Sequence, residues 1–153
     1  KATDEVFAMQ EELAFVSDKL KDVQDNINNR ANNNEKMKDI KKQADVLSKK
    51  IDGILVTLAA SIEGTNITGE EKLREKIGML YASLAGYIGR PTDSQMDRTK
   101  GLRKELEDVK AKIELIYTTD LPKFNKTLEK NMVDLVKPMT QQEWDEKTKK
   151  EKK

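Results

Sequence analysis

The sequence predicts an all-α protein, arranged as an antiparallel up-down-up-down four-helix bundle. Apolar residues recur at alternating spacings of three and four along most of the chain, which is the period of helices that pack against other helices. Only 3 Pro and 7 Gly occur among 153 residues, fewer turn residues than a β-rich fold requires. Charged residues make up 37% of the chain, which suits long helices with wide solvated faces.

The first two helices are predicted from apolar stripes on either side of an Asn-rich stretch at residues 28–34. Asn competes for backbone hydrogen bonds and tolerates left-handed geometry, so this stretch is expected to end the first helix. The second helix is expected to begin near Glu35 and to end at Gly64, where a left-handed residue is favoured. The stripes are Val6, Met9, Leu13, Val16, Leu20, Val23 and Ile27, and then Met37, Ile40, Ala44, Leu47, Ile51, Ile54, Leu58 and Ile62.

The third helix is predicted to open with a capping box of Thr68 and Glu71 and to close at Gly89. A second capping box, which begins at Thr92, opens the fourth helix. Pro122 lacks an N–H and clashes one turn back, so the fourth helix is expected to kink there. The stripes are Leu73, Ile77, Leu80, Leu84 and Ile88, and then Met96, Leu102, Leu106, Val109, Ile113, Ile116, Leu121, Phe124, Leu128, Met132 and Leu135.

Pro138 separates the predicted bundle, residues 1–138, from a short charged C-terminal helix or frayed tail, residues 139–153. Thr140 and Glu143 form a third capping box. The lysines of this tail could contact phosphate or lipid headgroups weakly, but the acidic residues among them dilute the positive field, and a solvated helix is the alternative. These lysines are Lys147, Lys149, Lys150, Lys152 and Lys153.

The composition excludes several kinds of chemistry. The chain has no Cys and no His, so it cannot form a zinc finger, a thiol active site, a His-ligated haem site or an imidazole base. Its carboxylates lie off the apolar stripes among lysines, whereas a di-iron bundle needs inward Glu-x-x-His pairs. We therefore expect no catalytic, metal-binding or cofactor-binding residues and no enzymatic activity. The net charge of +1 gives no general attraction to nucleic acid.

Two short motifs have both a structural and a functional interpretation. The segment Gly86–Thr92 precedes a helix N-terminus and contains Arg90, so it could hold an anion or could simply connect two helices tightly. Its glycine spacing matches neither the P-loop nor the dinucleotide fingerprint. The triplets beginning at Asn66 and Asn125 match the N-glycosylation pattern, which matters only in a eukaryotic secretory setting.

The stretch Ile77–Gly89 is the most informative part of the sequence because it contains no charged residue. A helix in a bundle normally keeps one polar, wet face. Either the third helix is covered on all sides within the chain, or its outer side contacts a partner. The candidate partner surface consists of Met79, Tyr81, Tyr87, Ile88 and Arg90.

The segment Leu80–Asn131 carries a resemblance to a known family. Its residues Tyr81–Gln95 and Asp120–Asn125 resemble the C-terminal helical region of bacterial secreted proteins with sortilin-like, Asp-box β-propellers, often labelled glycosyl hydrolases. The resemblance covers about a third of the chain, and the Ser-x-Asp-x-Gly-x-x-Trp repeat of the propeller is missing. It implies an accessory helical domain of a secreted or cell-envelope protein, with Gly89–Thr92 as the turn that fixes helix packing, and no catalytic role for any residue here.

Three functions remain open at this point. The first is a non-catalytic accessory or interaction domain from the C-terminal part of a larger bacterial secreted propeller protein, with the parent propeller or a second copy as its partner. The alternative is a free-standing, coiled-coil-like adaptor or scaffold, which the unbroken heptads favour. A third is a bundle that opens on a membrane surface. The chain begins at Lys1, so we expect it to be a piece of a longer or processed protein, and no apolar stretch is long enough for a membrane span.

Overall fold

The computed structural model describes residues 2–34, 36–59, 62–63, 66–67 and 71–153, and its regular structure there is helical apart from one short strand pair. Strands β1 (Ile62–Glu63) and β2 (Asn66–Ile67) pair antiparallel, with Ile62 opposite Ile67. The predicted all-helical class is confirmed. The helices are α1 (Ala2–Asn32), α2 (Lys38–Leu58), α3 (Leu73–Ala85), α4 (Asp93–Leu115), α5 (Leu121–Lys130) and α6 (Gln141–Glu151), with a π-helical turn, η1 (Ile116–Asp120), between α4 and α5.

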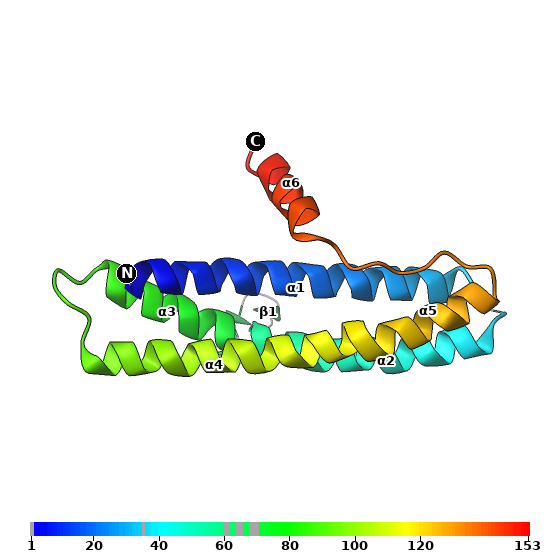
Figure 1. Cartoon of the computed structure of the whole chain (residues 1–153), viewed down its shortest axis with the longest axis horizontal. Coiled ribbons are helices and arrows are strands. Elements are labelled where there is room, and N and C mark those ends of the chain that lie inside the picture. The colour runs from blue at the N-terminus through cyan, green and yellow to red at the C-terminus, as the bar shows by residue number, and fades with distance from the viewer. Residues whose placement is uncertain (1, 35, 60–61, 64–65, 68–70) are drawn as a thin grey trace.

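Three helical columns run side by side along an elongated body (Figure 1). The first column is α1, the second is α2 followed by α3, and the third is α4, η1 and α5. The second column runs antiparallel to α1: Gln24, late in α1, donates to Asp52 of α2 at 2.6 Å, and Phe7, early in α1, meets Tyr81 of α3. The third column returns parallel to α1.

The structure does not confirm the predicted up-down-up-down four-helix bundle. α2 and α3 continue in one direction and share one side of α1, so each level of the described bundle contains three helices rather than four (Figure 1). Sequence periodicity shows which face of a helix is apolar but not which helix that face meets. The length of α1 explains why the bundle has three columns. Its 31 residues are long enough to pack against α2 and then against α3.

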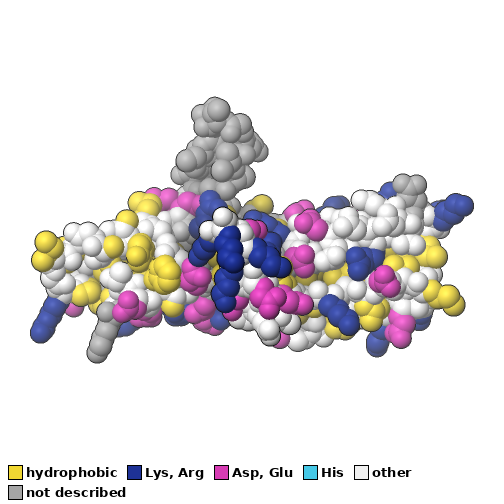
Figure 2. Space-filling view, turned by 90° about the horizontal axis from the view of Figure 1, so that it is seen from above, with side chains coloured by type: hydrophobic (Ala, Val, Ile, Leu, Met, Phe, Trp, Pro, Cys, Tyr) yellow, Lys and Arg dark blue, Asp and Glu magenta, His cyan; other side chains and the backbone are white. Residues whose placement is uncertain are grey.

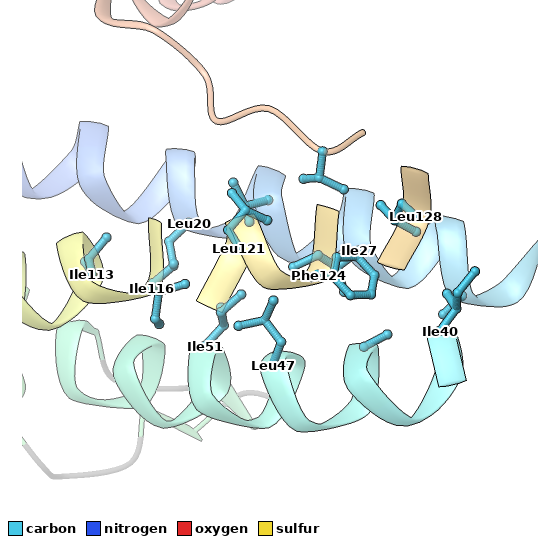
Figure 3. Packing of buried hydrophobic residues seen from close by; sticks show 14 of the residues in the cluster. Leu20, Ile27, Ile40, Leu47, Ile51, Ile113, Ile116, Leu121, Phe124 and Leu128 are labelled. Atoms are coloured by element: carbon cyan, nitrogen blue, oxygen red, sulfur yellow. The ribbon is translucent and has the colours of Figure 1, made fainter. Parts of the chain in front are cut away.

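The core consists of two apolar clusters, one after the other along the body, and each receives residues from all three columns. The first cluster includes Leu20, Ile51 and Leu121 (Figure 3). The second includes Val6 and Ile77, with Leu106 from α4. Every residue of the stripe predicted for the first helix is buried, so that part of the prediction is confirmed.

The end of α2 and the start of α3 differ from the sequence prediction. α2 ends at Leu58, before the predicted end at Gly64, which lies outside the described residues. Leu58 and Arg74 border the same cavity against α1, so the first turn of α3 takes the place into which α2 would continue. α3 begins at Leu73, after the predicted Thr68 box, whose Thr is not described. The Glu75 carboxylate instead accepts from the backbone N–H at the start of α3, at 3.2 Å.

The predicted interruption near Pro122 is present as the π-helical turn η1. The Leu121 N–H donates to the Ile116 carbonyl, five residues back, and Pro122 follows in the first turn of α5, where its missing N–H breaks no helical hydrogen bond. The third column therefore continues to Lys130 without losing contact with the other two. Thr92 caps α4 as predicted, with its hydroxyl accepting from the Gln95 N–H at 3.2 Å.

After α5 the chain turns back and lies along α1 (Figure 1). We call residues 133–140 of this segment the strap. The Asn125 side chain of α5 makes two hydrogen bonds of 2.9 Å with the backbone of Val136, one as donor and one as acceptor. Arg30 of α1 donates to two further strap carbonyls, at 3.2 and 3.3 Å. Val136 is 1% exposed and belongs to the first core cluster.

Within residues 139–153, Gln141–Glu151 form the helix α6, and the predicted Thr140–Glu143 capping box is in place. Trp144 anchors α6 to α1. Its Nε1–H donates to Asp18 Oδ2 at 2.9 Å, and its ring meets the Phe15 ring nearly edge-on at 5.6 Å. Beyond this first turn α6 points away from the body, and its lysines are exposed (Figure 1).

Candidate functional site

The outer side of α3 is an exposed apolar surface. Its inner stripe, which includes Ile77 and Leu84, is buried against the other columns. On the other side Met79 is 55% exposed, and the residues between it and the end of the helix are Ala and Ser apart from the stripe and Tyr81. The chain therefore covers only one face of the uncharged stretch Ile77–Gly89. The interpretation that the whole stretch is covered within the chain is wrong for the side that carries Met79.

Tyr81 extends this surface toward α1. Its half-buried ring lies 6.2 Å from the Phe7 ring at an interplanar angle of 48°. Phe7 is itself 51% exposed and was not among the sequence candidates. The sequence offered one indication that Phe7 is exposed. It follows Val6 of the buried stripe directly, so it falls on the outer face of the first helix. The tertiary fold was needed to place that face next to α3.

The turn after α3 carries the most exposed apolar residues of this end. Tyr87 is 52% exposed and Ile88 is fully exposed, although periodicity had placed Ile88 in a buried stripe. The helix ends at Ala85, so Ile88 no longer follows helical periodicity. Gly89 has φ +157°, and a Cβ there would come within 2.9 Å of the Tyr87 ring. The Tyr87 ring therefore lies close to Gly89, and a side chain at that position would displace the ring.

We call the group formed by Phe7, Met79, Tyr81, Tyr87 and Ile88 the α3-end surface. Arg90, the remaining sequence candidate, is exposed beside it. Between Tyr87 and α4 lies a cavity of about 330 Å³, bordered by Leu84, Pro91 and Met96. Figure 2 shows hydrophobic side chains toward both ends of the body, this end being on its left, while Lys, Arg, Asp and Glu crowd the middle. The structure thus brings all five predicted surface residues to one end of the molecule.

The geometry of the Gly86–Thr92 turn favours a helix connection over an anion site. Thr92 and Gln95 satisfy each other's backbone N–H groups, with the Gln95 Oε1 accepting from the Thr92 N–H at 2.9 Å. An anion at this helix start would compete for the same donors. This turn therefore orients Tyr87 and Ile88 and leaves Arg90 in solvent.

A charged cluster joins α1 to α4 away from the α3-end surface. Arg103 Nη1 lies 3.0 Å from both carboxylate oxygens of Glu12, and Lys110 Nζ lies 3.3 Å from Glu12 Oε2. Partial burial by itself raises the pKa of Glu12, but the Arg103 hydrogen bond and charge, together with Lys110, hold that pKa below its ordinary value. The cluster fixes the register of two columns and contains no group suited to nucleophilic or acid–base chemistry.

Tyr117, in the π-helical turn, has the most perturbed environment among the described titratable groups. Burial raises the pKa of its hydroxyl well above the ordinary value, and the charges of Asp22 and Glu114 raise it further. The Lys19 Nζ lies 4.6 Å from the ring centroid. Within the described part of the chain the hydroxyl has no hydrogen-bond partner. A phenol held neutral without a partner base does not form a catalytic pair.

The described residues contain no cluster of three or more acidic side chains placed to hold a metal ion. In the same part of the chain, no helix is long and apolar enough to cross a membrane. Comparisons with protein-family models, with curated proteins and with solved structures gave no match. The resemblance to the helical region of propeller proteins therefore remains a prediction from the sequence.

Proposed function

We propose that this chain is a non-catalytic interaction domain that binds a protein partner through the α3-end surface. The observation that carries the proposal is the exposure of Met79, Tyr87 and Ile88 at one end of the body, with the exposed Phe7 against Tyr81 at the same end. Aromatic and large aliphatic side chains that are exposed together, rather than singly, are typical of protein-binding surfaces. Nothing in the described chain covers them.

The partner that fits the sequence resemblance is a β-propeller of the same parent protein, in a bacterial secreted or cell-envelope setting. The helical body would then be an accessory domain that packs on the propeller through one of its ends. Support comes from position, because the Tyr81–Thr92 residues that carry the resemblance are the same residues that form the α3 end and its turn.

Tyr87→Asp and Ile88→Asp test this proposal in the full-length gene product. Each places a charge on the α3-end surface at a side chain that is at least half exposed, so folding is expected to be unchanged by circular dichroism. We expect protease cleavage between the helical domain and the rest of the protein to become at least several-fold faster, because the two parts no longer protect their junction.

The matched control is Val46→Asp, an exposed apolar residue of α2 that lies far along the body from α3. This variant is expected to leave cleavage and sedimentation unchanged. Equal behaviour of the wild-type chain and both α3-end variants would rule out the proposed surface. If the full-length product contains no propeller, the parent-domain partner is wrong and the adaptor alternative gains support.

A further inference from the structure

A second surface of the molecule holds an extended segment of chain, and it lies elsewhere than the α3-end surface. The strap is bound from two sides, by Arg30 of α1 and Asn125 of α5. Asn125 pairs with both polar backbone groups of Val136, which is how one residue of a strand is recognised. The Val136 side chain fills a place in the core, and Trp144 makes a further anchored contact.

We call the surface of α1 and α5 that binds the strap, with Arg30 and Asn125, the groove. A strained hinge at Met132 connects α5 to the strap. The Met132 N–H donates to the Glu129 carbonyl at 3.1 Å, and the Val133 N–H donates to the Leu128 carbonyl at 2.9 Å. These two bonds define a Schellman motif, whose left-handed position is normally Gly. Met132 occupies that position with φ +57° and is 97% exposed. A side chain is disfavoured in this conformation, and no packing contact compensates for it.

We propose that the strap and α6 exchange between two copies of this chain, so that each groove binds residues 133–151 of the other copy. The contacts of Arg30, Asn125 and Asp18 are the same whichever copy supplies the segment. Only the hinge differs, because an open hinge releases the left-handed Met132. Exchange of an identical element through a strained hinge is a low-cost route to a dimer.

The architecture supports exchange in two ways. The strap spans eight residues, and an extended segment of that length covers roughly 26 Å, enough to leave one body and enter another. The hinge also lies at the α5 end of the body, opposite the α3-end surface (Figure 1). A second copy can therefore approach the hinge without meeting the surface assigned above to a different partner.

Two substitutions at the hinge test the exchange in opposite directions. Met132→Pro cannot adopt the left-handed conformation of the closed hinge, because the proline ring restricts φ to negative values, so the hinge must open. Met132→Gly relieves the strain of the closed hinge. After refolding of the whole chain at high concentration, we expect Met132→Pro to sediment as a dimer with Trp144 still buried by fluorescence. We expect Met132→Gly to form at least about fivefold less dimer than the wild-type chain.

A complementation experiment identifies the contacts within the dimer. One chain carries Val136→Asp, so its strap cannot bind. A second chain carries Arg30→Ala with Asn125→Ala, so its groove cannot bind a strap. In the Met132→Pro background neither chain alone should dimerise through exchange, whereas their mixture should form a heterodimer with one docked Trp144. A Met132→Pro dimer that persists with Val136→Asp would mean association elsewhere, and it would overturn the proposal.

The wild-type chain keeps the inference testable if the Pro variant fails to fold. A wild-type chain that stays monomeric after concentrated refolding, with Met132→Gly indistinguishable from it, would also overturn the exchange. Tyr87→Asp separates this inference from the proposed function, since the exchanged dimer should be insensitive to that change. A dimer lost with Tyr87→Asp would therefore contradict exchange and support the α3-end surface.

Discussion

Met132 and Tyr117 each occupy a position that a different residue would fill at lower free energy. Met132 takes a left-handed turn conformation without glycine's freedom. Tyr117 places a hydroxyl where the described chain offers it no hydrogen-bond partner. We expect no catalytic or metal-binding role for either side chain, so their cost can be measured as stability alone.

Met132→Gly is expected to raise the free energy of unfolding of the monomer by about 1 kcal/mol, because the left-handed position no longer meets a Cβ. Urea unfolding at low protein concentration measures the change. Met132→Ala is the matched control, since it shortens the side chain but keeps the Cβ, and it should leave the free energy nearly unchanged. An equal gain from Ala and Gly would show that the side chain, not the backbone, carries the cost.

Tyr117→Phe is expected to be neutral or slightly stabilising near pH 7, because it removes a hydroxyl without removing a hydrogen bond seen in the fold. The raised pKa means that the folded state keeps the proton after the unfolded state has lost it. Wild-type stability should therefore fall as the pH rises above about 10, by less than about 1.4 kcal/mol per pH unit since the ring is partly exposed.

The measurement that isolates Tyr117 is the difference in unfolding free energy between the wild-type chain and Tyr117→Phe from pH 8 to 11. Lysines that titrate in the same range affect both chains and cancel in this difference. A difference that does not change with pH would contradict the raised pKa of the phenol.

At the scale of elements, the strap and the π-helical turn complete the first core cluster. Val136 comes from the strap, and Ile116 comes from η1. Ile116 continues the stripe predicted for the fourth helix, whereas Val136 follows no helical periodicity and is buried all the same. The half of the body that contains this cluster therefore depends on α5 in two ways. The apolar stripe of α5 packs into the cluster, and α5 also binds the strap.

Asn125→Ala is expected to lower the free energy of unfolding by about 2 kcal/mol, because the backbone N–H and carbonyl of Val136 both lose their partner in a partly buried site. Urea unfolding gives the loss, and Trp144 fluorescence reports whether α6 has come free. Lys126→Ala, one exposed position further on, is the control and should change the free energy by less than about 0.5 kcal/mol. A loss with Lys126→Ala as large as that with Asn125→Ala would contradict the role of the side-chain pair.

At the scale of the whole molecule, the three columns make an elongated body. A helix of 31 residues is about 46 Å long, and the third column is longer. A compact globule of this chain length has a radius of gyration of roughly 15 Å. We expect about 18 Å by small-angle scattering of the monomer, because the body is stretched along one axis. A radius as small as that of the compact globule would contradict the three-column arrangement, and one approaching roughly 30 Å would indicate an extended rod.

Prediction from the sequence succeeded where one local rule was enough. The a/d stripe of the first helix, the capping boxes at Thr92 and Thr140 and the interruption near Pro122 each follow from spacing or from residue chemistry within a turn. The α3-end residues were chosen for lack of charge, and the structure exposes Met79, Tyr87 and Ile88. Phe7 was missed because its membership of that surface depends on which part of α1 lies beside Tyr81.

What the sequence by itself determined is the helical class, the buried faces and the lack of His and Cys chemistry, because these depend on residue type and spacing alone. The tertiary structure decided how many helices meet at each level. An apolar stripe is satisfied by any complementary stripe, so local sequence does not distinguish a four-helix bundle from three columns in which α2 and α3 share a side. Length matching along α1 and the return of the strap settle that choice through contacts between distant residues.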